Sequence, residues 1–111
     1  MKTGEIWLVN FSPSVGDEIN KTRPAVIISN DDIAGLDLRI VVPVTGAKRP
    51  DRPWHIKIIP TNTNSLVKES FVDCFQLKSI SSQRFVRKLG ALSVKDMDDV
   101  KIGITKVLDL A

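Results

Sequence analysis

The sequence of 111 residues has very few side chains that bind metals or form disulfides: one cysteine and one histidine. The single cysteine, Cys74, excludes an internal disulfide. Together with the single histidine, His55, it leaves no cluster at metal-ligand spacing. No apolar run approaches the roughly 18 residues that span a membrane. The first residues carry charge but no apolar stretch follows them, which is not typical of a signal peptide, so we expect a cytoplasmic protein.

Two nucleotide-binding signatures are also missing, Gly-x-Gly-x-x-Gly and Gly-x-x-x-x-Gly-Lys-Ser/Thr. Their absence, with that of a metal cluster, argues against nucleotide-dependent and metal-dependent enzymes. We interpret His55, between Trp54 and Lys57 in a predicted strand, as a surface residue. We interpret Cys74 as a small buried apolar side chain.

What is present is the composition of a folded domain, with 42% hydrophobic and 26% charged residues. The length predicts a single domain over residues 1–111. The formal net charge is +3, and basic residues gather in 48–57 and 78–88. Such segments suit a polyanion partner, but they also occur on an ordinary solvated face, so charge alone does not decide between the two.

Short apolar runs bounded by turn residues predict a mainly β protein. Residues 12–20 read as a long polar loop. Pro24 is expected at the first position of its strand, where a proline is tolerated. The expected strands are 6–11, 24–28, 38–44 (ending at Thr45 and Gly46), 54–59, 70–77 and 85–92.

The last segment has the pattern of an amphipathic helix of about 17 residues. Ser93 and Asp96 form a variant of the capping box that begins a helix. Apolar residues then recur on one face at helical spacing: Met97, Val100, Ile104, Val107 and Leu108. Gly103 costs about 1 kcal/mol inside a helix relative to alanine, which favours close packing there.

Arg23 and Thr45 are the polar residues with the clearest potential for chemistry. Arg23 lies where the polar loop meets a buried strand, and its guanidinium can bind phosphate oxygens in bidentate fashion. Thr45 ends the next strand, before Gly46, at which a backbone can approach another molecule closely. Antiparallel pairing of the two strands would bring Arg23 beside Thr45. The alternative is that Arg23 pairs with an acid such as Glu18 and that Thr45 merely caps a turn.

Several motifs resemble those of the MazF/PemK toxin family, in order and over nearly the whole chain. The most specific is the stretch from Lys21 to Asp31, Lys-Thr-Arg-Pro-Ala-Val-Ile-Ile-Ser-Asn-Asp. The others are Gly4-Glu5-Ile6-Trp7, Pro13 with Gly16-Asp17-Glu18, Val42-Pro43-Val44-Thr45, Cys74-Phe75-Gln76-Leu77-Lys78-Ser79-Ile80 and Leu89-Gly90-Ala91-Leu92-Ser93.

The resemblance implies a small SH3-like β-barrel of the MazF/PemK/CcdB type, with the amphipathic helix at its C-terminal end. It implies a homodimeric, sequence-specific endoribonuclease that cleaves single-stranded RNA (mRNA) without metal or cofactor. The expected products are a 2′,3′-cyclic phosphate and a 5′-OH. It also implies a cognate acidic antitoxin that covers the RNA groove.

The resemblance assigns catalysis to Arg23 and Thr45, and RNA contact to Glu18 and Gln76. We expect further RNA contacts from Asn20, Lys21, Gly46, Lys48 and Lys78, with the three lysines lining a groove between two subunits. One departure concerns the PemK branch, which has an acid after the cysteine as a proposed general base and an arginine before it. This chain has Phe75 and Asp73 at those positions, so that assignment does not carry over.

Two other functions remain open from the sequence. One is a non-catalytic SH3-like binding module, which would not need Arg23. The other is a gyrase-inhibiting toxin on the same fold, acting on a protein through its terminal helix. The Thr-Arg-Pro motif and the basic segments favour RNA over both.

Overall fold

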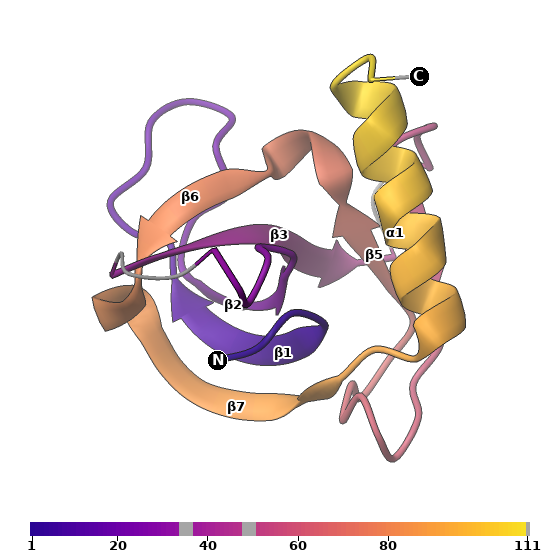
Figure 1. Cartoon of the computed structure of the whole chain (residues 1–111), viewed down its shortest axis with the longest axis horizontal. Coiled ribbons are helices and arrows are strands. Elements are labelled where there is room, and N and C mark those ends of the chain that lie inside the picture. The colour runs from indigo at the N-terminus through magenta and orange to yellow at the C-terminus, as the bar shows by residue number, and fades with distance from the viewer. Residues whose placement is uncertain (34–36, 48–50, 111) are drawn as a thin grey trace.

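The computed structural model describes residues 1–33, 37–47 and 51–110 as one curved seven-stranded sheet with a C-terminal helix (Figure 1). Two short 3-10 turns, η1 (Cys74–Gln76) and η2 (Ser82–Arg84), interrupt the strands. The strands are β1 (Glu5–Asn10), β2 (Thr22–Ile27), β3 (Leu38–Gly46), β4 (His55–Ile58), β5 (Ser70–Asp73), β6 (Lys78–Ser81) and β7 (Phe85–Ala91), and the helix is α1 (Val94–Val107).

All the strand pairs are antiparallel, in the order β4-β5-β3-β2-β1-β7. β6 also pairs with β3, on the side where β5 lies and opposite to β2. The mainly β prediction is therefore confirmed. Within the described ranges the end strands β4 and β7 do not pair with each other, so the expected barrel is a curved, unclosed sheet.

The sheet buries side chains on both faces, because alternate residues of a strand point to opposite faces. Val26, Val42 and Val44 belong to the core beneath α1, whereas Ala25, Ile27 and Val41 belong to a second core on the other face. Phe11 and Ile19, which flank the β1–β2 loop, help to cover this second core. The loop is therefore part of the packing and not only a surface connection.

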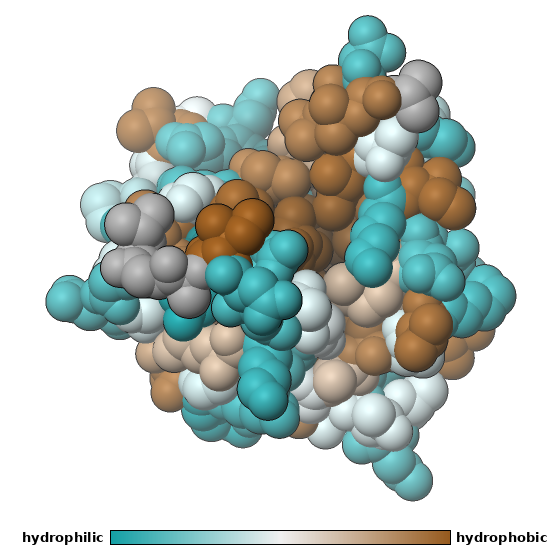
Figure 2. Space-filling view, viewed as in Figure 1, coloured by the Kyte–Doolittle hydropathy of each residue, from teal (hydrophilic) through white to brown (hydrophobic). Residues whose placement is uncertain are grey.

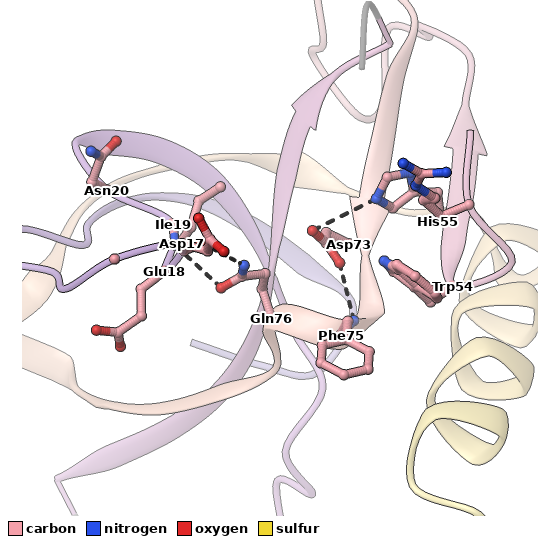
Figure 3. Close-up of a pocket in the computed structure, with 11 residues that line it drawn as sticks. Asp17, Glu18, Ile19, Asn20, Trp54, His55, Asp73, Phe75 and Gln76 are labelled. Atoms are coloured by element: carbon pink, nitrogen blue, oxygen red, sulfur yellow. Dashed lines mark hydrogen bonds and ion pairs between the residues drawn. The ribbon is translucent and has the colours of Figure 1, made fainter. Parts of the chain in front are cut away.

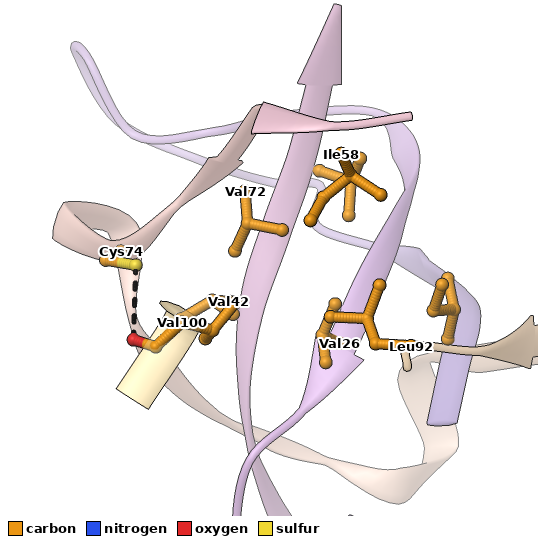
Figure 4. Packing of buried hydrophobic residues seen from close by; sticks show 9 residues of the cluster. Val26, Val42, Ile58, Val72, Cys74, Leu92 and Val100 are labelled. Carbon is orange, nitrogen blue, oxygen red and sulfur yellow. Dashed lines mark hydrogen bonds between the residues drawn. The ribbon is translucent and has the colours of Figure 1, made fainter. Parts of the chain in front are cut away.

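Helix α1 begins as the capping pattern predicted, with the Ser93 Oγ accepting a hydrogen bond from the Asp96 N–H at 3.1 Å. Val100 is fully buried (Figure 4). A Cβ at Gly103 would lie 2.8 Å from the Cys74 Sγ, so the predicted close packing is confirmed. The apolar stripe ends at Val107, because Leu108 forms the C-cap and is exposed. No helix in the described ranges is both long and apolar enough to cross a bilayer.

Three details of the strand prediction are wrong. β2 begins at Thr22, so Pro24 is its third residue, which is possible because the ladder to β3 begins only at Ala25. The expected strand 70–77 ends at Asp73, whose carboxylate caps the turn η1. The short strand β6 was not predicted, because Lys78–Ser81 contains a single large apolar residue, Ile80.

Burial changes along β3, because residues 41–45 are all buried whereas Leu38 and Ile40 at its start are 46% and 38% exposed. The cause is that α1 packs against η1 and β4 and so does not cover the start of β3. Apolar surface extends from α1 toward the middle of this view of the molecule (Figure 2).

Candidate functional site

The antiparallel pairing of β2 with β3 includes Ala25–Ile27 and stops two residues short of Arg23 and Thr45, so their predicted proximity stays a prediction. The register pairs Ala25 with Pro43 and Val26 with Val42. Continuing this register by two residues would place Arg23 opposite Thr45. Both residues lie at odd positions of their strands, so both side chains are on the sheet face opposite to α1.

The two residues differ in their surroundings. Arg23 is half-buried, and its Nε donates a hydrogen bond to the Asn20 carbonyl at 3.0 Å. It has no carboxylate partner among the residues that the structure describes. Thr45 is 2% exposed, and its Oγ1 has no hydrogen-bond partner among the described residues. An unpartnered buried hydroxyl costs about 1–3 kcal/mol, which a protein tolerates most readily where a ligand supplies the missing bond.

Gln76 fixes the β1–β2 loop above this face (Figure 3). Its Oε1 accepts a hydrogen bond from the Ile19 N–H at 3.2 Å, and its Nε2 donates one to the Asp17 carbonyl at 2.9 Å. The two bonds bracket the residue between them, Glu18. The predicted RNA contacts Glu18 and Gln76, which are far apart in sequence, are therefore neighbours in space.

Other predicted RNA contacts lie around the same loop. Glu18 accepts a hydrogen bond from the Val15 N–H at 2.8 Å, and its Oε2 lies 3.7 Å from the Lys78 Nζ. The alternative partner for Arg23, Glu18, is thus engaged elsewhere. Asn20 and Lys21 are exposed at the end of the loop, with Lys21 at a positive φ of 65°.

Two predicted contacts lie on the chain that follows Thr45. Gly46 ends β3, and a Cβ added there would meet the Lys68 Nζ at 3.5 Å, an ordinary contact. Lys48 lies outside the described residues.

Arg84 holds the first end of the β1–β2 loop. Its Nη1 donates hydrogen bonds to the Asn10 carbonyl at 3.1 Å and to the Ser12 carbonyl at 2.7 Å. At the other end, Ile19 is 5% exposed within the second core. The loop is therefore attached at both ends, while Val15 between them is 79% exposed.

A pocket of about 630 Å³ opens beside the loop (Figure 3). The loop and η1 form one side of the pocket, and β4 with the residues before it forms the other. Arg23 and Thr45 do not line it. Its lining residues are Gly16, Asp17, Glu18, Ile19, Asn20, Arg52, Trp54, His55, Asp73, Phe75 and Gln76.

His55 is a lining residue of this pocket, and the prediction that it lies on the surface was wrong. Its side chain is only 6% exposed, and its ring stacks on Phe71 at 5.0 Å between centroids. The Nε2 lies 3.7 Å from the Asp73 Oδ2, whereas the Nδ1 is buried and has no hydrogen-bond partner within residues 1–33, 37–47 and 51–110. The sequence alone could not show the burial of His55, because the residues that surround it are distant in the sequence. The pairing of β4 with β5 makes His55 and Asp73 neighbours.

The residues around Cys74 form a rigid turn. Cys74 is fully buried, which confirms that prediction, and burial raises the pKa of its thiol to about 11. Asp73 Oδ1 accepts a hydrogen bond from the Phe75 N–H at 3.1 Å. Phe75 itself is 64% exposed. No group of three His, Cys, Asp or Glu side chains within the described ranges converges as a set of metal ligands would.

Comparison with known families identifies the chain. A model of the PemK-like, MazF-like toxins of type II toxin–antitoxin systems matches residues 2–108. The chain belongs to this toxin family. The resemblance drawn from its motifs is therefore confirmed over almost the whole sequence.

Individual relatives agree with this assignment to the MazF-like toxins. The chain is 31% identical to endoribonuclease MazF9 of Mycobacterium tuberculosis over 116 residues, covering 99% of this chain and 98% of the relative. Its fold matches the crystal structure of MazF from Deinococcus radiodurans with a TM-score of 0.82 at 20% identity, over 98% and 96% of the two chains. It also matches an endoribonuclease of a mycobacterial species in complex with its cognate antitoxin, with a TM-score of 0.80 at 15% identity, over 100% and 97%.

The two bonds from Gln76 lead to a prediction about the loop of this MazF-like toxin. Replacing Gln76→Ala should speed amide hydrogen exchange at Ile19 and lower the free energy of unfolding by about 1–3 kcal/mol, since each of the two bonds contributes roughly 0.5–1.5 kcal/mol. The matched control is Gln83→Ala, at an exposed glutamine of η2. Unchanged exchange at Ile19 in the Gln76 variant would contradict the role of this side chain in fixing the loop.

Proposed function

We propose that this protein is the toxin of a toxin–antitoxin pair and acts as a sequence-specific, metal-independent endoribonuclease on single-stranded RNA. Its place in the MazF-like family supports this function, and its 31% identical relative from M. tuberculosis is named an endoribonuclease. The observation that supports the proposal is the antiparallel β2–β3 register, which, if continued by two residues, would set Arg23 opposite Thr45 on one face of the sheet. We place the activity in the cytoplasm, where mRNA is found.

The reaction fits the chemistry of these two residues. RNA contains its own nucleophile, the 2′-OH, next to the phosphate to be cleaved. The protein needs to align that hydroxyl with the bond and stabilise the charge that develops on phosphorus. The Arg23 guanidinium would neutralise that charge, and the Thr45 hydroxyl would donate a hydrogen bond to a non-bridging oxygen. The products would be a 2′,3′-cyclic phosphate and a 5′-OH.

The β1–β2 loop and η1 would hold the RNA around this centre. We propose Glu18, Asn20, Lys21, Gly46, Lys48, Gln76 and Lys78 as its contacts. The exposed lysines would neutralise phosphates, whereas Glu18 and Gln76 offer hydrogen-bonding groups suited to bases. The ion pair between Glu18 and Lys78 would open or rearrange as the strand binds.

We further propose that the protein is a homodimer that binds an acidic antitoxin over the same surface. Leu38 and Ile40 supply exposed apolar area on β3 for contact between subunits. The net charge of +3 would attract an acidic partner and RNA alike. A structural neighbour from a mycobacterial species is an endoribonuclease in complex with its cognate antitoxin.

If Arg23 acts through its planar guanidinium, replacing it with another cation of different shape should lower the activity. Arg23→Lys keeps the charge but removes the planar fork, so kcat for RNA cleavage should fall about a hundredfold or more. Urea unfolding should match the wild type within about 1 kcal/mol, because in the part of the chain that the structure describes the Arg23 side chain makes one hydrogen bond, to a carbonyl. Wild-type turnover in this variant would disprove the assigned role.

Thr45 offers a test that separates activity from stability. Thr45→Val keeps the volume and removes an unpartnered buried hydroxyl, so stability should stay equal or rise. The rate of cleavage should nevertheless fall about 10- to 150-fold, the range expected for a lost hydrogen bond to a charged group. Thr45→Ser, which retains the hydroxyl, is the matched control and should keep most of the rate. A fully active Thr45→Val variant would remove Thr45 from the reaction.

Chelators and salt test the mechanism as a whole. Cleavage of a long RNA should proceed unchanged in EDTA and yield 5′-OH ends. RNA affinity should fall steeply with salt, with a slope of about −0.7 per phosphate contacted for a single strand. Activity that disappears in EDTA and returns with magnesium would overturn the metal-free mechanism. An RNA left intact under all conditions would favour a non-catalytic module or a toxin that acts on a protein.

A further inference from the structure

The pocket beside the β1–β2 loop is not used by the mechanism proposed above, because Arg23 and Thr45 do not line it. Its volume of about 630 Å³ lies within the range of ligand-binding pockets, roughly 300–1,000 Å³. It adjoins the proposed reaction centre, because His55 in its wall stacks on Phe71, the strand partner of Thr45. It also shares Glu18, Asn20 and Gln76 with the proposed RNA contacts.

Phe75 gives the pocket an open aromatic surface. The ring is 64% exposed, which makes it the most exposed aromatic side chain that the structure describes. Trp54 supports it, with 5.3 Å between ring centroids and 52° between ring planes. The Asp73 carboxylate fixes the Phe75 backbone through the hydrogen bond to its N–H. A rigid ring with one supported and one open side is the arrangement on which nucleobases stack.

His55 gives the pocket wall an unused polar atom. Its side chain is 94% buried, stacked on Phe71 and close to Asp73, so its orientation is fixed. Its Nδ1 nonetheless has no partner in the described part of the chain. The Nδ1 has almost no accessible surface, so a ligand group would complete this hydrogen bond, and remove a cost of about 1–3 kcal/mol, by displacing a neighbouring part of the pocket wall.

The charges around the pocket favour a base over a phosphate. Asp17, Glu18 and Asp73 supply three carboxylates, against one guanidinium from Arg52. A phosphate group would be repelled by this excess of negative charge. A nucleobase is uncharged, has N–H groups for such acceptors and has two flat faces for stacking.

We propose that this pocket is a nucleobase subsite, in which one base of the bound RNA stacks on Phe75 and forms a hydrogen bond with the Nδ1 of His55. Phe75 then contributes affinity for any base, and His55 contributes discrimination between bases. The inference rests on the proposed function, because it assumes that the ligand is RNA. It adds to that function the place where a nucleotide outside the cleaved bond is recognised.

The experiment begins by mapping the cleavage site of the wild-type protein on a long RNA. A set of oligonucleotides that span this site is then prepared. Each has a 2′-deoxy residue at the cleaved position, which prevents the reaction. Each also has an abasic nucleotide at one position, and that position differs from one oligonucleotide to the next. Binding is measured for the wild type and for Phe75→Leu, which keeps apolar volume but loses the ring. Phe75→Tyr is the matched variant that keeps the ring, and Val67→Ala at a 94% exposed residue outside the pocket is the surface control.

We expect that an abasic nucleotide at one position weakens RNA binding by the wild type about 5- to 150-fold, the range for the loss of one stacked base. The same abasic nucleotide should leave RNA binding by Phe75→Leu unchanged. Phe75→Tyr and Val67→Ala should behave as the wild type. If the loss of affinity from Phe75→Leu adds to the loss from the abasic nucleotide at every position, the subsite is overturned, whereas the proposed nuclease function is not affected. Absence of any RNA cleavage by the wild type would instead overturn the proposed function.

His55→Phe tests the second half of the proposal, because it keeps the stacking on Phe71 but removes both nitrogens. At the position identified by the abasic scan, the wild type should prefer one base, and this variant should bind the four bases within about twofold of one another. The affinity for an oligonucleotide with an abasic nucleotide at that position should be the same in both proteins. Retained preference in His55→Phe would overturn the role of His55. An effect of Phe75→Leu on subunit or antitoxin binding alone, with RNA binding unchanged, would overturn the subsite.

Discussion

The antiparallel pairing of β2 with β3 is the constraint on which the rest of the site depends. Its register determines which residues share a face, because alternate side chains of each strand point in opposite directions. A slip of β2 by one residue would move Arg23 to the side covered by α1, away from Thr45, and would bring Val26 out of the core. The same hydrophobic pattern that stabilises the sheet therefore also positions the polar pair.

This dependence explains what could be predicted from the sequence. The prediction that Arg23 and Thr45 lie near each other required only the assumption that consecutive strands pair antiparallel. The helix start at Ser93 needed only local capping chemistry. Both features depend on residues close in sequence or on strands that follow each other, so they were within reach of pattern analysis.

The features that were missed depend on contacts between distant segments. His55 has the sequence context of a surface residue, and its burial results from Asp73 and Phe71 on β5. Leu38 and Ile40 have the alternation of a buried face, but the helix that would cover them packs elsewhere. The turn η1 looks like strand because Cys74 and Phe75 are apolar, and it bends because the Asp73 carboxylate caps it. In each case tertiary packing outweighed the local pattern.

The two attachments of the β1–β2 loop have a consequence for how such toxins can diverge. Arg84 holds the carbonyls of Asn10 and Ser12, and Ile19 is buried in the second core, so the ends of the loop are part of the sheet's own structure. The exposed residues between these anchors have few packing constraints, and exposed loop segments tolerate substitution and insertion well. Related toxins could therefore acquire different RNA preferences by changing exposed side chains such as Val15 at little cost to folding, whereas Gly16, at a φ of +58°, is constrained by its backbone. The fold separates the part of the chain that must stay constant from the part that is free to evolve.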